Sequence, residues 1–197
     1  MRLFKKRRKR RIETTTPPVP VLQTERLVLR SFDENDAVDV YAYAHSNQVG
    51  PMAGWAPHAS IEDSRKTIRM FIDGGEVWAM VEKKSGRVIG SIGLHKDTVR
   101  SIGGAKELGY ALGETHWGQG YAAEASQEVL RYGFEELAAP IIGVSHFPTN
   151  GQSKRVIEKL GFSYEGTIRH AQQLPDDSIT DIVCYSLLKS EYEEQKK

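Results

Sequence analysis

The stretch that decides the fold is WGQGYAA, residues 117–123, which lies between an expected strand and an expected helix. Gly118 and Gly120 allow a tight turn in which bare backbone N–H groups come close to a ligand. The helix that follows adds the unpaired N–H donors and the positive dipole end of its first turn. Small residues leave that first turn unobstructed. The pattern therefore predicts a binding site for a phosphate or a pyrophosphate.

Two nucleotide-binding motifs can be weighed against this turn. No Lys-Ser/Thr pair follows the glycines, which argues against a P-loop nucleoside triphosphatase. G-x-G-x-x-A over 118–123 also fits the dinucleotide fingerprint, but that fold expects an acidic residue near the end of the next strand. Residues 141–147 carry none. A nicotinamide oxidoreductase stays a competing class, as does a glycine loop that only permits close helix–sheet packing.

Outward from the turn, hydrophobic periodicity predicts elements in the order βααβββαβαββ. The expected strands cover 26–30, 77–83, 87–94, 107–112, 141–146, 162–168 and 180–188, and the expected helices cover 33–44, 60–72, 121–137 and 150–160. Gly and Pro punctuate 45–59 too densely for regular structure, and turns are expected at 85–86 and 175–178. This order predicts an α/β sandwich around a mixed sheet.

Composition limits the class of protein. A chain of 197 residues fits one domain with a tail. The hydrophobic fraction is 39%, and no apolar run approaches the roughly 18 residues that span a bilayer, which argues against an integral membrane protein. One cysteine, Cys184, forms neither an internal disulfide nor a thiolate zinc cage, so no metal is expected. Without a hydrophobic signal-peptide core, we expect a soluble, cytoplasmic protein.

Charge is distributed unevenly along the chain. Residues 1–13 carry eight basic side chains and one acidic one, which leaves 19 basic against 25 acidic residues in the remainder. The segment 2–11 is therefore expected to be disordered until it meets a ribosome, RNA or another anionic surface. A solvated tail without a dedicated partner is the alternative. We expect a basic tail and Pro-rich linker over 1–20, one domain over 21–192 and a charged C-terminal tail over 193–197.

Motifs spread over most of residues 22–192 carry a resemblance to a known family. They are TERLVLR at 24–30, G-x-x-I-G at 86–90, ELGYAL at 107–112, WGQGYAAEA at 117–125, N-x-x-S at 150–153, EKLGF at 158–162 and EGTIR at 165–169. Together they resemble the GNAT superfamily of N-acetyltransferases, and most closely its Rim-type branch, which acetylates protein N-termini and related amines. The resemblance implies a three-layer sandwich whose mostly antiparallel mixed sheet splays between the central strands.

The resemblance also implies that acetyl-CoA is the co-substrate. Its pyrophosphate would lie on the turn and helix start formed by Trp117, Gly118, Gln119, Gly120, Tyr121, Ala122 and Ala123. Trp117 stands where the general family pattern has Arg or Gln. The pantetheine arm would pair with the strand edge at Tyr110, Ala111 and Leu112, and Asn150 would contact it. Lys154 and Arg155 would meet the 3′-phosphate or only solvent.

The implied reaction is attack of a free amine on the thioester carbonyl through a tetrahedral oxyanion. An α-amine, with a reference pKa of about 7.7–8.0, is roughly 10% neutral at pH 7, whereas lysine is below about 0.1% neutral. An N-terminal amine is therefore the easier nucleophile. Glu107 resembles the position from which family members draw a proton, often through water, and is expected to act as general base and to contact the substrate. A solvated or salt-bridged strand carboxylate is the alternative.

Two further steps need donors. A backbone N–H near Ala111 or Leu112 is the expected oxyanion donor. The resemblance implies that Ser153 meets the leaving sulfur. Other members use a tyrosine four residues further on, where this chain has Ile157, so Ser153 is expected to take that catalytic role. A bare helix-start hydroxyl is the alternative.

The remaining candidates concern the acceptor. Trp55 is expected to line the acceptor pocket, or else to serve packing alone. His95, His116 and His146 lack metal-ligand spacing and are expected to be structural or incidental. The sequence thus predicts an acetyl-CoA-dependent N-acetyltransferase acting on a primary amine. A non-catalytic CoA-binding or ribosome-associated module is the alternative, and a monomer and a homodimer both remain open.

Overall fold

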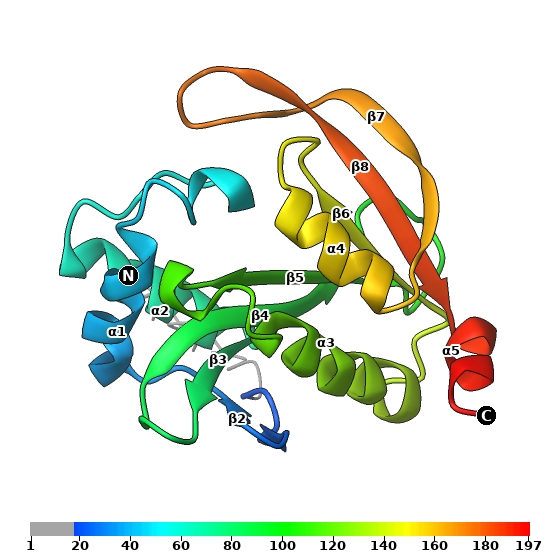
Figure 1. Ribbon diagram of the computed structural model, residues 1–197, viewed down its shortest axis with the longest axis horizontal. Helices are drawn as coiled ribbons and strands as arrows, with labels where there is room; N and C mark the ends of the chain where they lie inside the picture. Colours follow the sequence, from blue (N-terminus) through cyan, green and yellow to red (C-terminus); the bar gives the residue numbers. More distant parts are fainter. Residues whose placement is uncertain (1–17) are drawn as a thin grey trace, which may run out of the picture.

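One eight-stranded sheet forms the centre of the protein (Figure 1). The computed structural model describes residues 18–197, so the expectations for the basic segment 2–11 lie outside the described residues. The strand order is β1-β2-β3-β4-β5-β6-β8-β7. The strands are β1 Leu22–Gln23, β2 Leu27–Arg30, β3 Val77–Glu82, β4 Val88–Lys96, β5 Lys106–Leu112, β6 Ile141–His146, β7 Ser163–Gln173 and β8 Ile179–Leu188.

Helices cover both faces of this sheet. They are α1 Ala37–Ala44, α2 Ile61–Gly74, α3 Tyr121–Arg131, α4 Gly151–Lys159 and α5 Lys189–Gln195, with short 3₁₀ turns at Glu34–Asp36, Pro51–Ala53 and Glu114–His116. Within residues 18–197, none of the helices is both long and apolar enough to cross a bilayer.

The continuous apolar run of β3 explains the three layers. Val77, Ala79 and Val81 pack into one core cluster with α1 and α2. Trp78 and Met80 point the other way, into a larger cluster that includes the buried face of α3. A strand buried on both faces must lie between two helical layers. The expected three-layer α/β sandwich is therefore confirmed.

The sheet opens between its two central strands. Every adjacent pair is antiparallel except β5 and β6, which run parallel. Their pairing ends where Leu108 lies opposite Val144, although β5 continues against β4 as far as Leu112. Beyond Leu108 the edge of β5 that faces β6 therefore has no partner strand among the described residues. This opening is the expected splay.

Several elements differ from the sequence prediction. The expected helix over 121–137 ends one residue early, at Glu136, and its last turn, Tyr132–Glu136, is π-helical. β7 continues to Gln173, five residues beyond the expected end at 168. β1 was not predicted, because it is only two residues long and follows prolines.

α5 was not predicted either. It extends into the segment 193–197, which was expected to be a charged tail. The ring of Tyr192 stacks on the buried Phe134, with 4.7 Å between ring centroids. Tertiary packing, which is invisible in the polar local sequence, docks this helix.

Candidate active site

The glycine-rich turn has the backbone that its sequence predicts. Gly118 has φ +72° and Gly120 has φ +84°, in the left-handed region that favours glycine. A β-carbon added at Gly118 would meet no heavy atom within 4 Å, so the backbone angle, rather than crowding, requires glycine there. Gly120 is the N-cap of α3, and no described side chain caps the first-turn N–H groups. These donors point to an anion site.

Side chains on both sides fix the turn in place. Arg26 donates from Nη1 to the Gln119 carbonyl at 2.9 Å and pairs with Glu124 of α3 at 2.6 Å. Trp117 donates its indole N–H to the Leu112 carbonyl at 2.7 Å, which ties the turn to the end of β5. These contacts hold the turn to β2 and β5 without engaging the backbone N–H groups of residues 118–123.

The open edge of β5 supplies a second set of backbone groups. Gly113 donates its N–H to the Ile89 carbonyl of β4 at 2.9 Å. Bonding direction alternates along an antiparallel ladder, so the backbone groups of Leu112 and Tyr110 point away from β4. The Trp117 bond to the Leu112 carbonyl agrees with this direction. Of the two expected oxyanion donors, the geometry favours the N–H of Leu112 over that of Ala111.

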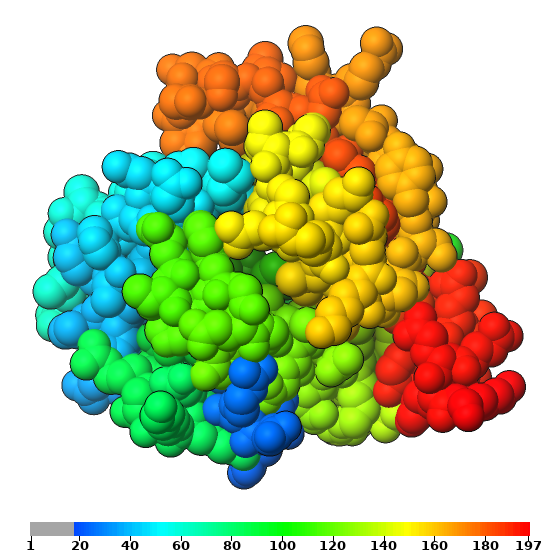
Figure 2. All heavy atoms as spheres, in the orientation of Figure 1, coloured from blue at the N-terminus to red at the C-terminus, as the bar shows by residue number. Residues whose placement is uncertain are grey.

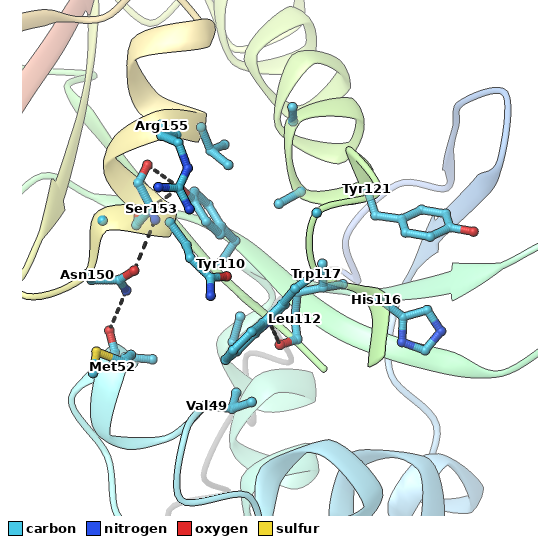
Figure 3. Close-up of a pocket in the computed structure, with 18 of the residues that line it drawn as sticks. Val49, Met52, Tyr110, Leu112, His116, Trp117, Tyr121, Asn150, Ser153 and Arg155 are labelled. Atoms are coloured by element: carbon cyan, nitrogen blue, oxygen red, sulfur yellow. Dashed lines mark hydrogen bonds between the residues drawn. The ribbon is translucent and has the colours of Figure 1, made fainter. Parts of the chain in front are cut away.

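A cavity of about 600 Å³ joins these two features (Figure 3). The glycine turn, the β5 edge and the start of α4 line it, and Arg155 and Lys159 bring positive charge to its wall. Figure 2 shows the hollow between the green turn region and α4 in yellow. The cavity suits a long phosphorylated carrier with an amide-bearing arm. The main-chain donors and the two cations would bind its pyrophosphate, and the unpaired strand edge would pair with its arm.

A smaller chamber of about 240 Å³ lies on the other side of the splay. Strands β4, β5 and β6 contribute His95, Glu107, Ser145 and His146 to its wall, and the β7–β8 hairpin contributes Gln172. Five residues line both spaces: Met52, Ala53, Tyr110, Asn150 and Ser153. The chamber and the larger cavity therefore meet at one junction.

Glu107 lies in this chamber, on β5 next to the point where the sheet opens. Its Oε1 accepts a weak hydrogen bond from Ser145 Oγ at 3.4 Å. Burial, reinforced by the nearby charge of Asp97, raises the pKa of the Glu107 carboxyl above its ordinary value. Such a carboxylate is a stronger proton acceptor than a solvated glutamate.

Ser153 lies at the junction, paired with a partner that was not predicted. The Tyr110 hydroxyl is 2.8 Å from Ser153 Oγ and 3.3 Å from the Ser153 carbonyl. Burial raises the pKa of Tyr110 to about 12, so the phenol stays protonated near neutral pH. The sequence predicts a role only for the backbone of Tyr110. Strand alternation, which places Tyr110 on the α4 face with Leu108 and Leu112, is the signal that identifies its side chain.

Asn150 and Ile157 both stabilise the position of α4, one as its cap and the other in the core. The Asn150 side chain accepts from the Ser153 N–H at 3.0 Å and donates to the Met52 carbonyl at 3.1 Å, so it caps α4 and ties it to residues 51–53 (Figure 3). Its amide is thus already committed on both ends, although Asn150 still lines both spaces. Ile157 is fully buried in the core.

Two predicted site residues lie elsewhere. Trp55 lines neither space. It is partly buried, packs against Gly50 and against the core cluster of α1 and α2, and its ring lies 5.3 Å from the His58 ring. Met52 and Ala53 from the same loop face the junction instead. The Gln119 side chain turns back to the Thr115 carbonyl at 2.8 Å, and this residue does not line the large cavity. Spacing alone did not show which way these loop side chains turn.

Comparison with known proteins identifies the family. Residues 26–163 match the model of the acetyltransferase (GNAT) domain, and this span contains the glycine turn, the splay and the junction. The chain belongs to the GNAT family and is an N-acetyltransferase. The family uses acetyl-CoA, which agrees with the character of the large cavity.

Individual relatives extend the match over most of the chain. An uncharacterized N-acetyltransferase of Bacillus licheniformis is 32% identical over 176 residues, which are 87% of this chain and 97% of that protein. The ribosomal-protein-serine acetyltransferase of Escherichia coli is 26% identical and covers 83% of this chain and 93% of its own length. A GNAT-family acetyltransferase structure from Bacillus anthracis superposes with a TM-score of 0.79 at 26% identity, covering 87% of this chain and 100% of its own. These relatives support the Rim-type resemblance.

Proposed function

We propose that this enzyme transfers the acetyl group of acetyl-CoA directly to a primary amine that enters through the small chamber, and that the natural acceptor is an N-terminal α-amine or a small amine. The observation that carries this proposal is the junction. The large cavity and the small chamber, which Glu107 lines, share five lining residues: Met52, Ala53, Tyr110, Asn150 and Ser153.

On the carrier side, the N–H groups from Gly118 to Ala123 would hold the pyrophosphate, with Arg155 and Lys159 beside them. The arm would lie along Tyr110 and Leu112, which brings the thioester to the junction. There the Leu112 N–H is directed to hydrogen-bond the carbonyl oxygen as it becomes an oxyanion.

On the acceptor side, Glu107 would take the proton of the incoming ammonium, directly or through water. The neutral nitrogen then forms a bond to the carbonyl carbon, the carbon–sulfur bond breaks, and the nitrogen gives up its second proton. The departing thiolate would take up that proton through the Ser153 hydroxyl, which Tyr110 supports at 2.8 Å. The negative charge on Glu107 also favours a cationic acceptor over a neutral or anionic one.

An α-amine suits this chamber better than lysine does. At pH 7 the neutral fraction of an α-amine is several hundred times that of a lysine side chain, so Glu107 needs to remove a proton from fewer of the incoming molecules. A relative, the E. coli ribosomal-protein-serine acetyltransferase, is named for a protein acceptor, which supports a protein as one candidate acceptor here.

Acetyl transfer can be tested with purified protein, acetyl-CoA and a panel of matched peptides. One peptide has a free N-terminus and acetylated lysines, and its partner has an acetylated N-terminus and free lysines. Polyamines, amino acids and aminoglycosides complete the panel. We expect CoA release with the first peptide and a single added acetyl group at its N-terminus by mass spectrometry. CoA binding without release above hydrolysis on any amine would instead support the non-catalytic binding module.

A further inference from the structure

The proposed reaction leaves a proton on Glu107. A primary ammonium loses two protons as it becomes an amide: one reaches the thiol of CoA by way of Ser153, and Glu107 takes the other. Glu107 must release its proton to solvent before it can serve the next ammonium. Burial raises the pKa of this partly buried carboxyl, so it gives the proton up less readily than a solvated glutamate does. Turnover therefore needs an exit for the proton.

His95 lies directly opposite Glu107, on the neighbouring strand β4. Side chains that are directly opposite in an antiparallel pair share one face of the sheet, with about 5 Å between their β-carbons. Both side chains line the small chamber, and Glu107 is the one carboxylate of residues 18–197 that does so. Asp97 and Arg100, on the connection between β4 and β5, are further charged groups that act on Glu107. His95 is therefore positioned to exchange a proton with Glu107, directly or through one water.

Two glycines give the His95 ring its place on the sheet. Gly93 and Gly109 lie opposite each other in the same two strands. A β-carbon at Gly93 would come within 2.9 Å of His95 Cε1 and closer still to Nε2, and one at Gly109 would lie 3.9 Å from Nε2. The ring therefore lies back over the glycine pair, and a side chain at position 93 would displace it. Its Nε2 is held against the sheet beside the strand that carries Glu107.

Glu76 determines which nitrogen of this ring carries the proton. Its Oε2 lies 3.2 Å from His95 Nδ1. An ionised carboxylate only accepts, so Nδ1 donates to it, and in the neutral ring the lone pair is on Nε2. The side chains of His95 and Glu76 are 44% and 41% exposed, so this pair connects the chamber with solvent. When Nε2 gains a proton, the new positive charge lies beside the fixed negative charge of Glu76.

We infer that His95 carries the proton of the acceptor amine from Glu107 to solvent. This inference rests on the proposed function. The Nε2 lone pair forms a bond to the proton as the O–H bond of Glu107 breaks. The imidazolium, paired with Glu76, then gives the proton to water or buffer, and both groups return to their starting states. His95 thus acts through Glu107 and not on the substrate, where the sequence had indicated a structural or incidental histidine.

His45 provides a control outside the chamber. Its Nδ1 lies 2.8 Å from the Tyr41 carbonyl, so it is also a histidine whose Nδ1 has an acceptor. It is exposed at the end of α1 and lines neither the small chamber nor the large cavity. His45→Ala and His95→Ala remove the same atoms, and only the second removes a titratable neighbour of Glu107.

The first test is kinetic and uses the most active amine of the panel in weakly buffered solution at neutral pH. We expect His95→Ala to lower kcat about tenfold, which is less than the loss of a general base, because water replaces a relay in part. Added imidazole should restore most of that kcat as its concentration rises, since it can take the proton from Glu107 in place of the missing ring. His45→Ala should match the unaltered enzyme and should not respond to imidazole.

A second variant separates proton transfer from packing. His95→Gln keeps a side chain that can hydrogen-bond Glu76 but cannot gain a proton, so it should be as slow as His95→Ala. Full activity of His95→Gln would overturn the inference, as would equal kcat for His95→Ala and His45→Ala, or a loss that imidazole does not relieve. In each of these cases acetyl transfer still stands. A panel on which no amine is acetylated would instead overturn the relay and the proposed function together.

The contact between the two groups can also be measured without turnover. In ¹⁵N NMR of the labelled protein at mildly alkaline pH, we expect Nδ1 of His95 to carry the proton and Nε2 to be unprotonated. The Nε2 resonance should move in Glu107→Gln, while the resonances of His45 in the same spectrum should not. A neutral ring with its proton on Nε2, or an Nε2 resonance that is the same in both proteins, would refute the contact on which the relay depends.

Discussion

The two spaces that meet at the junction are built in different ways. The large cavity is formed by main-chain groups from two short stretches, the turn before α3 and the edge of β5, and its side chains mostly hold that backbone in place. The small chamber is lined by side chains from four strands and from the loop at 51–53. In the proposed function, main-chain groups bind acetyl-CoA, the co-substrate that the whole family shares, and side chains bind the acceptor amine. Substitutions should therefore separate the two spaces.

The largest effect is expected in the chamber. Glu107→Gln should lower kcat/KM for the amine by about 10²- to 10⁴-fold, because it removes the proton acceptor. Burial and the charge of Asp97 raise the pKa of Glu107, so the unaltered enzyme should lose activity as pH falls through that raised value. The variant should lack this limb of the pH–rate profile, and acetyl-CoA affinity by calorimetry should not change. Identical pH–rate profiles for the variant and the unaltered enzyme would show that Glu107 is not the proton acceptor.

The same variant has a stability consequence of opposite sign. A carboxyl whose pKa is raised by folding stabilises the fold below its unfolded pKa, and this contribution is lost as pH rises through the folded pKa. Ionisation of Glu107 therefore opposes folding. Glu107→Gln should be as stable as the unaltered protein or more stable in urea at pH 7, and a clear loss would contradict the burial argument.

The next effect is expected at the large cavity, for which Gly118 of the glycine turn and Gly86 of the turn between β3 and β4 form a variant and its matched control. Gly118 and Gly86 have φ +72° and +69°, and a β-carbon at either would meet nothing within 4 Å. Alanine at either should cost about 1–2 kcal/mol of unfolding free energy. Gly118→Ala should also weaken CoA binding about tenfold or more by displacing the turn N–H groups, while Gly86→Ala leaves calorimetric affinity intact. Equal affinities would show that the turn does not hold the carrier.

A smaller effect is expected at the junction itself. Tyr110→Phe removes the hydroxyl 2.8 Å from Ser153, and a single hydrogen bond of about 0.5–1.5 kcal/mol predicts a threefold to tenfold lower kcat. Ser153→Ala should lower kcat at least as much. Because the two hydroxyls act on one leaving group, the double variant should be little worse than Ser153→Ala. Additive losses in single-turnover kinetics would show that Tyr110 acts independently.

The smallest catalytic effect is expected at Trp55. Its ring packs between Gly50 and His58 rather than on the chamber. Trp55→Phe should reduce the free energy of unfolding by about 1 kcal/mol and leave KM for the amine unchanged. A raised KM for the amine with unchanged stability would show that Trp55 contacts the acceptor.

Most of the architecture could be predicted from the sequence because its signals are local. Alternation in 26–30, the unbroken apolar run of β3 and the alanine-rich start of α3 each require a particular element. β1 and α5 were missed because neither has a local pattern of its own. One is two residues long, and the other is a polar segment held by the stacking of Tyr192 on Phe134.

The sequence by itself determined the glycine turn beside the large cavity, because positive φ at Gly118 and Gly120 and the helix start behind them depend on adjacent residues. The small chamber was decided only by tertiary structure. The Tyr110–Ser153 pair spans 43 residues, and the chamber is lined by residues as far apart in sequence as Met52 and Gln172. Which way a loop side chain turns, and which side chains lie opposite one another across the sheet, depend on packing between segments that no local spacing encodes.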